Sequence, residues 1–229
     1  MSKRIAYGRT ILDAGINIES RMLREPNATE KFTSSNLLVS HIALGVPIKQ
    51  NWGLSFGLRP LTRISYNISS GERSSFNSDS LITLAQGDGG AYLPYVGTGF
   101  RIPIGKKHFL SMGANLGYLF GQKDIATRRA IVNDSLAFNA ANVHAKTSYG
   151  NLYWSAGLQY QMKFNKDVYL TLGAYGSLQQ TLKAKQDLIA ETYFYDPSVG
   201  YVQLDSVRAT KGVKGDIEYP ASYTIGFVL

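Results

Sequence analysis

The chain has 229 residues, 24 of them Lys or Arg and 16 Asp or Glu, and its formal net charge is +8. Because it contains no cysteine, a disulfide scaffold, a cysteine-ligated metal site and a thiol nucleophile are excluded. The 12% of aromatic residues exclude a disordered chain, and no apolar run is long enough for a transmembrane helix. The length predicts a single domain over residues 1–229.

Alternation of apolar and polar residues dominates the chain and predicts strands rather than helices. Glycines inside the alternating stretches, such as Gly113 and Gly157, argue further against helices. The predicted fold class is therefore all-β. Eight extended segments follow in chain order: Tyr7–Glu19, Ser35–Pro47, Trp52–Ile68, Gly89–Pro103, His108–Phe120, Asn151–Phe164, Val168–Gln180 and Tyr219–Leu229.

The connections between these segments alternate strictly in length. Short turns are predicted at Ile48–Asn51, Ile104–Lys107 and Asn165–Asp167, and long loops at Ser20–Ser34, Ser69–Asp88, Gly121–Gly150 and Thr181–Glu218. Short turns on one rim and long loops on the other are typical of transmembrane β-barrels. The pattern predicts an antiparallel up-and-down transmembrane β-barrel in the outer membrane of a Gram-negative cell, with about eight strands in this chain.

The two faces of the predicted strands differ in composition. One face is bulky and apolar, and the other consists of Gly, Ser and a few polar residues, whereas a soluble barrel turns its apolar face inward and a charged face to water. We therefore expect the apolar face to contact lipid and the small-residue face to line the lumen. The residues predicted to face lipid are Trp52, Leu54, Phe56, Leu58, Leu116, Tyr118, Phe120, Trp154 and Leu158.

One hairpin carries a more specific signal. The run Leu44-Gly45-Val46-Pro47-Ile48, followed by Trp52-Gly53-Leu54 and Gly57-Leu58-Arg59-Pro60, resembles a hairpin of FadL-type outer-membrane transport proteins of the Bacteroidetes branch. Leu116–Gly121 and Ile217–Phe227 resemble the same family. The resemblance implies a fourteen-stranded barrel with an N-terminal plug, which admits hydrophobic molecules through a lateral opening.

The chain departs from that family in three respects, since it shows only eight segments, no plug and no secretion signal. The expectation is therefore an internal piece of a longer protein, with a complete eight-stranded barrel as the alternative. The expected function is passive uptake of hydrophobic small molecules, and the expected partners are outer-membrane lipid and the hydrophobic ligand. Lipopolysaccharide or a secretion partner is expected at the basic long loops, and nucleic acid is not, because no binding motif accompanies the charge.

Polar and charged residues of the small-residue face are the candidate substrate-binding positions, because ionisable groups within a membrane span pair with one another or line a pathway. They are Asp13, Asn17, Glu19, His41, Arg59, Arg101, Asn115 and Gln159. The alternative interpretation is structural: Arg59 and Arg101 pair with Asp13 and Glu19 as struts across the lumen.

Two other functions remain open at this point. A structural or protein-interaction barrel, such as a FadL-like component of type 9 secretion, would hold a protein on its long loops. An outer-membrane lipid hydrolase would use Ser55 in the G-x-S-x-G run Gly53–Gly57, but that motif needs a strand-to-helix turn and here it lies within an alternating strand. No histidine has the spacing of a metal site. The sequence thus predicts no enzyme activity, no metal and no cofactor.

Overall fold

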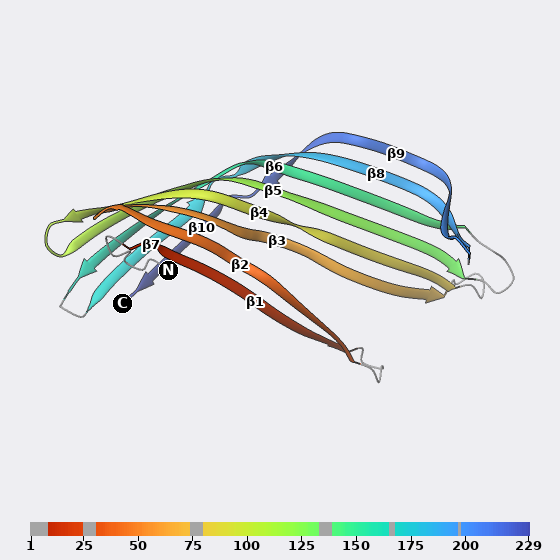
Figure 1. Cartoon of the computed structure of the whole chain (residues 1–229), viewed down its shortest axis with the longest axis horizontal. Helices are drawn as coiled ribbons and strands as arrows, with labels where there is room; N and C mark the ends of the chain where they lie inside the picture. The colour runs from red at the N-terminus through yellow and green to blue at the C-terminus, as the bar shows by residue number, and fades with distance from the viewer. Residues whose placement is uncertain (1–8, 25–30, 74–79, 133–138, 165–167, 197) are drawn as a thin grey trace.

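The computed structural model describes residues 9–24, 31–73, 80–132, 139–164, 168–196 and 198–229. These residues form one antiparallel sheet, so the prediction of an all-β, up-and-down fold is confirmed (Figure 1). The strands are β1 (Ile11–Arg24), β2 (Lys31–Lys49), β3 (Trp52–Arg73), β4 (Ser80–Ile104), β5 (His108–Val132), β6 (Ala140–Lys163), β7 (Tyr169–Ser177), β8 (Gln180–Asp196), β9 (Gly200–Tyr219) and β10 (Ser222–Val228).

The ten strands run along eight lines, because two of the lines are interrupted. β7 pairs with Ala156–Lys163 of β6 and β8 pairs with Ala140–Gly150 of the same strand, so β7 and β8 follow each other along one side of β6. In the same way β10 pairs with β7, and β9 pairs with β8. The path across the sheet is β1-β2-β3-β4-β5-β6-β7-β10, and in the described residues β1 and β10 do not pair with each other. The sheet is a curled half-barrel.

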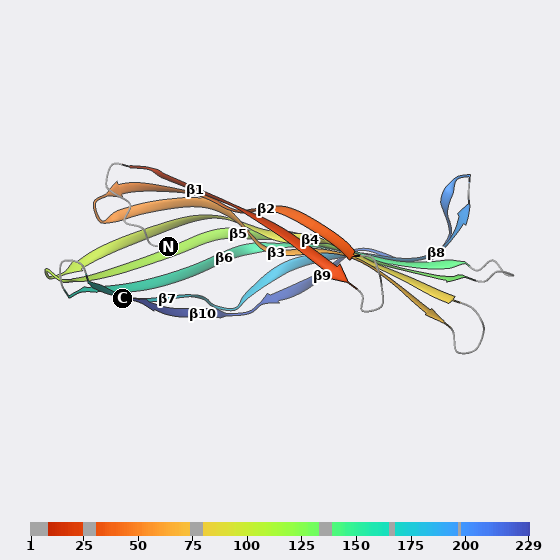
Figure 2. The ribbon, with the colours of Figure 1, turned by 90° about the horizontal axis from the view of Figure 1, so that it is seen from below.

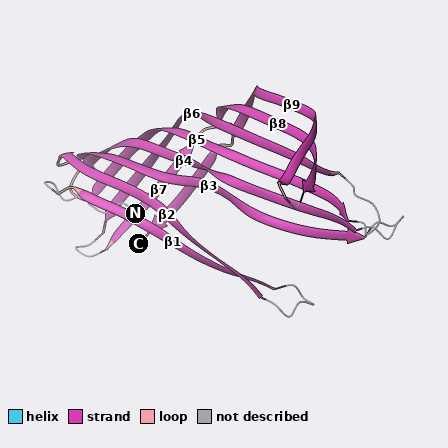
Figure 3. Cartoon of the chain, turned by 45° about the vertical axis from the view of Figure 1, so that its right-hand side comes forward, coloured by secondary structure: helices cyan, strands magenta, loops and turns pink. Residues whose placement is uncertain are grey.

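The prediction of four long loops is wrong. The strands continue well past their predicted ends: β3 runs to Arg73 and β4 starts at Ser80, and the strand pairs β1–β2, β5–β6 and β8–β9 are extended in the same way (Figure 3). In these extensions polar side chains occupy both faces, as in Gln122–Arg129 of β5. Backbone hydrogen bonds hold such a ladder without a buried apolar face, so hydrophobic periodicity gives no signal there.

Two of the three predicted short turns are confirmed. β2 and β3 are joined at residues 50–51, and β4 and β5 are joined at residues 105–107. Gly105 has a φ of 77°, a conformation that glycine adopts without strain, so this turn requires glycine at that position. The third predicted turn, Asn165–Asp167, lies outside the described residues.

Glycines stand in a row across four strands and permit the sheet to curl. Gly53 pairs with Gly99, Gly99 with Gly113, and Gly113 with Gly157. The next row on the same face is Ser55, Gly97, Asn115 and Ser155. Because side chains this small leave room on the concave side, the strands bend toward it. Figure 2 shows that the part of the sheet near the short turns is curled and the other part is flatter. We call the concave side the inner face and the convex side the outer face.

The buried apolar residues of the fold lie farther along the inner face. Leu93, Leu119, Tyr153 and Leu182 form one cluster, and each is at most 4% exposed. They come from β4, β5, β6 and β8, so β8 is packed against the uninterrupted strands. This cluster occupies the inner face beyond the glycine rows.

Candidate functional site

The inner face holds a polar cluster centred on Arg59 of β3. Its Nη2 donates a hydrogen bond of 3.4 Å to the hydroxyl of Tyr175 in β7, although three strands lie between β3 and β7 in the sheet. Its Nε is buried and has no hydrogen-bond partner among the described residues. The next inner-face residue of β3 is Gly57, which has no side chain, and the curl brings β7 toward β3 (Figure 2).

Buried serines extend this cluster toward the short turns. Asn115 Nδ2 donates a hydrogen bond of 3.4 Å to Ser155 Oγ, and Ser155 is 1% exposed. Ser177 is 2% exposed and shares a hydrogen bond of 3.2 Å with the Ser222 hydroxyl of β10. A Cβ atom at Gly97 would collide with the amide oxygen of Asn115, so the asparagine occupies the space that the glycine leaves. The inner face at this level is tightly packed.

The predicted struts across the lumen do not form. Asp13 lies 3.5 Å from Nε2 of His41, and Glu19 bonds Arg21 of its own strand. Both acids are in β1 at one end of the sheet, where the nearest cations belong to β1 and β2. Arg59 uses Tyr175 instead, so this structural interpretation is corrected.

The other predicted inner-face residues fall into separate groups. Arg101 Nη2 donates a hydrogen bond of 3.0 Å to Gln161 Oε1, and the guanidinium lies 4.0 Å from the centre of the Phe109 ring. Gln159 belongs to the same row as Arg101, because both pair with Ser111. Asn17 is exposed on β1. Among the eight predicted residues, the structure pairs Asp13 with His41. Arg59, Asn115 and Arg101 bond residues outside the predicted set.

The outer face is apolar and open. Seven of the residues predicted to face lipid are 40–58% exposed there: Phe56, Leu58, Leu116, Tyr118, Phe120, Trp154 and Leu158. Trp52 and Leu54 are half-buried on the same face. The Trp52 ring stacks on Phe100 at 5.6 Å between ring centres, and Tyr92 and Phe120 lie 6.0 Å apart. Contact of this face with lipid stays a prediction.

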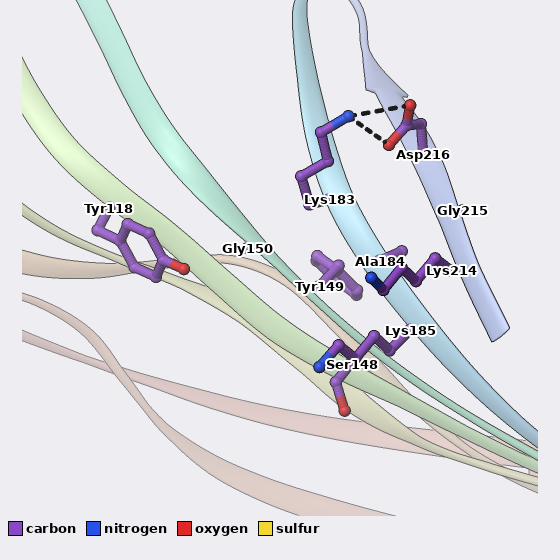
Figure 4. A pocket seen from close by; sticks show the side chains of 10 residues that line it. All are labelled: Tyr118, Ser148, Tyr149, Gly150, Lys183, Ala184, Lys185, Lys214, Gly215 and Asp216. Atoms are coloured by element: carbon purple, nitrogen blue, oxygen red, sulfur yellow. Dashed lines mark hydrogen bonds and ion pairs between the residues drawn. The ribbon is translucent and has the colours of Figure 1, made fainter. Parts of the chain in front are cut away.

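A hollow of about 740 Å³ lies where the outer face meets β8 and β9, and Tyr118 and Gly150 line it together with lysines (Figure 4). Lys183 Nζ bonds both carboxylate oxygens of Asp216, at 3.0 and 3.2 Å. Lys185 and Lys214 stand directly opposite each other in the ladder, and neither forms an ion pair within the described residues. The sequence analysis assigned residues 181–218 to a basic long loop, but these lysines lie in paired strands.

A second hollow, of about 810 Å³, crosses β3, β4, β5 and β6 and reaches Arg21 of β1. Inside it, Nε2 of His144 and Oδ1 of Asp124 are 2.6 Å apart. Asn142 Nδ2 donates a hydrogen bond of 2.7 Å to Glu191. Sequence reasoning missed this surface because it assigned all of these residues to loops.

The hydrolase motif has no catalytic geometry. Ser55 lies within β3 and pairs with Gly45 and Gly97, where the motif would need a sharp turn into a helix. In the described ranges, no group of three or more His, Cys, Asp or Glu has the arrangement of a metal site. The same ranges contain no helix long and apolar enough to cross a membrane.

A family model described as BamG matches residues 5–229. No curated protein and no solved structure matches the chain.

The match overturns the family resemblance drawn from the Leu44–Pro60 hairpin, because the matching family is not the FadL-type family. Passive uptake of hydrophobic molecules is therefore wrong as the function, and so are the alternatives of a FadL-like secretion component and a lipid hydrolase. The partners expected with them (outer-membrane lipid, a hydrophobic ligand, lipopolysaccharide or a secretion partner) are corrected too.

Proposed function

We propose that this chain, which belongs to the BamG family, acts in the assembly of outer-membrane proteins through contacts with proteins of the Bam complex. The observation that carries the proposal is the family match, because it covers residues 5–229 and therefore the whole sheet. The family belongs to the Gram-negative outer-membrane assembly machinery and is not an enzyme family. In this proposal the chain acts by binding proteins of the Bam complex.

The length of the strands supports a protein-contact role. β5 has 25 residues, which at about 3.3 Å per residue makes it roughly 80 Å long. The apolar band of an outer-membrane barrel is only about 25 Å tall. The outer-face stretch from Leu110 to Phe120 suffices for such a band, so we place this part of the sheet in the outer membrane. The remaining length of β5, from Gly121 to Val132, extends beyond the band and presents polar faces.

The membrane is then the location of the chain and the Bam-complex proteins are the partners on which it acts. A sheet that is curled but open has edges and faces that a second protein can cover, whereas a closed barrel has no edges. The polar extensions, with the 810 Å³ hollow and the lysine side of the 740 Å³ hollow, supply surface outside the membrane for the same contacts.

Depletion of the chain in its native host tests the proposal. We expect the amount of β-barrel proteins in the outer-membrane fraction to fall, because their assembly depends on the complex, while inner-membrane proteins stay at their normal level. The tagged chain should co-purify with Bam-complex proteins in mild detergent. Normal β-barrel levels after depletion, or purification of the chain without any Bam-complex protein, would contradict the proposed function.

A further inference from the structure

The sheet is split between β2 and β3. Ile42 of β2 is paired with Leu58 of β3, and the two strands stay paired from there to the short turn. On the other side of this pair, away from the turn, the two strands separate. Within the described residues, Lys31–His41 pairs only with β1 and Arg59–Arg73 pairs only with β4. Figure 3 shows the β1–β2 hairpin turning away from β3. Each side of the split therefore presents a row of backbone N–H and C=O groups without a strand partner.

Features of the sequence end the pairing at this point. The ladder between β1 and β2 skips Ser40, and the ladder between β3 and β4 skips Leu61, so each strand carries a bulge just beyond the last β2–β3 pair. A bulge bends its strand and increases the local twist. Pro60, next to the second bulge, has no N–H to give to a neighbouring strand. Sequence features of both β2 and β3 thus end the pairing between them.

The open edge of β3 lacks the protection that free edges usually have. Charged side chains, prolines and bulges normally prevent a free edge from pairing with another chain. Ile64–Gly71 contains no charged residue and no proline, and its ladder with β4 is regular. The free edge of β9 is protected, since Asp205, Arg208 and Lys211 lie along it and its ladder with β8 is irregular at three places. In contrast to the β9 edge, the β3 edge is therefore open to pairing with another strand.

We propose that Ile64–Gly71 of β3 is a strand-acceptor site, which binds an extended segment of another protein of the assembly machinery by β-strand addition. The inference rests on the proposed function, which supplies the partner. Backbone hydrogen bonds give affinity in this mode of binding, and alternate side chains give specificity.

The side chains along the edge define the segment that fits. Ile64, Tyr66 and Ile68 project to one face, and Tyr66 and Ile68 are 37% and 57% exposed. Ser65 and Asn67 project to the other face, and all four residues from Ser65 to Ile68 line the 810 Å³ hollow. The incoming segment therefore alternates apolar residues, which cover Tyr66 and Ile68, with polar residues, which lie beside Ser65 and Asn67.

Hydrogen exchange measured by mass spectrometry tests the site on the full chain, first alone in detergent and then in the complex purified from the native host. We expect amides of Ile64–Gly71 to exchange at least tenfold more slowly in the complex, because half of them gain a backbone partner. Amides of Ile125–Ala130 in β5, which is paired on both sides, serve as the control and should be slow in both samples.

Two results would overturn the site: equal exchange of Ile64–Gly71 in both samples, or slow exchange in the isolated chain, which would mean that β2 closes onto β3 by itself. A photoreactive p-benzoylphenylalanine in place of Tyr66 identifies the occupant. A cross-link to an alternating segment of a Bam-complex protein supports the proposal, whereas cross-links to lipid alone or to a second copy of this chain contradict it.

A matched pair of variants separates the site from general stability. Ile68→Lys places a charge on the open edge, and Val143→Lys places one on the interior strand β6 at a position 46% exposed. We expect the first variant to lose the slow exchange and the cross-link, and the second to keep both. If the chain co-purifies with the complex but Ile64–Gly71 stays fast, only the strand-acceptor site is wrong. If no Bam-complex protein co-purifies, the proposed function fails and the site with it.

Discussion

Arg59 and Tyr175 are 116 positions apart in the chain and meet across the inner face, with 3.4 Å between Nη2 and the hydroxyl oxygen. Their bond joins the third strand to the seventh without passing through the ladder. The Nε of Arg59 has no partner within the described residues. The hydrogen bond to the Tyr175 hydroxyl is therefore a main interaction that stabilises this half-buried cation. The pair connects the two sides of the curled region.

Removal of the phenol oxygen should therefore weaken the sheet. We expect Tyr175→Phe to lower the free energy of unfolding by about 1–3 kcal/mol, because a half-buried charged donor loses its acceptor. Urea unfolding in detergent measures the change. Tyr223→Phe is the control, since Tyr223 is 71% exposed, and it should change the midpoint little. Equal effects of the two variants would show that the Arg59–Tyr175 bond contributes nothing.

Gly89 of β4 should not tolerate a side chain. Its φ is 146°, and a Cβ atom there would collide with the backbone oxygen of Gln122 in β5, which has no freedom to rotate away. We expect Gly89→Ala to cost about 1–3 kcal/mol of unfolding free energy. Gly226→Ala in β10, where a Cβ meets nothing within 4 Å, should be neutral in the same unfolding experiment. If the Gly89→Ala variant is as stable as the wild type, the backbone at this position is not strained.

Substitution by glutamate should change the stability of the chain in opposite directions at two lysines of the outer-face hollow, Lys185 and Lys183. Lys185→Glu places a carboxylate opposite Lys214, and we expect a gain of about 0.2–1 kcal/mol that shrinks in high salt. Lys183→Glu destroys the pair with Asp216 and sets two acids opposite each other, so it should destabilise by a similar amount. Thermal unfolding at low and high salt measures both. Effects of the same sign would refute the interpretation of the ladder.

Two adjacent residues of β6 test which face meets the membrane. Leu158 is 50% exposed on the outer face, and Gln159 projects from the inner face. A lysine in the middle of a lipid-exposed face costs about 2–4 kcal/mol. We expect Leu158→Lys to reduce the fraction of chain recovered in the outer membrane, and Gln159→Lys to have a much smaller effect. A larger effect of Gln159→Lys than of Leu158→Lys would show that the inner face, and not the outer face, contacts the membrane.

The sequence predicted the fold wherever one face of a strand is apolar. Leu116 and Leu158 identify the outer face by alternation alone, and the small residues at Gly53 and Gly113 identify the inner one. The extension around Lys123 was missed because polar side chains lie on both faces of that ladder. Contacts such as Arg59 with Tyr175 depend on the curvature of the sheet, which no local pattern encodes. The Trp52-Gly53-Leu54 hairpin misled the family assignment, since glycine and aromatic residues serve the same physical purpose in unrelated barrels.

The strand order also bears on how the chain reaches its native state. Each line of the sheet pairs with the line before it, even where the last two lines are interrupted at residues 178–179 and 220–221. Pairing between successive lines keeps contacts short-range and lowers the entropic barrier to their formation. The chain is therefore suited to fold by successive pairing of hairpins that are neighbours in the sequence.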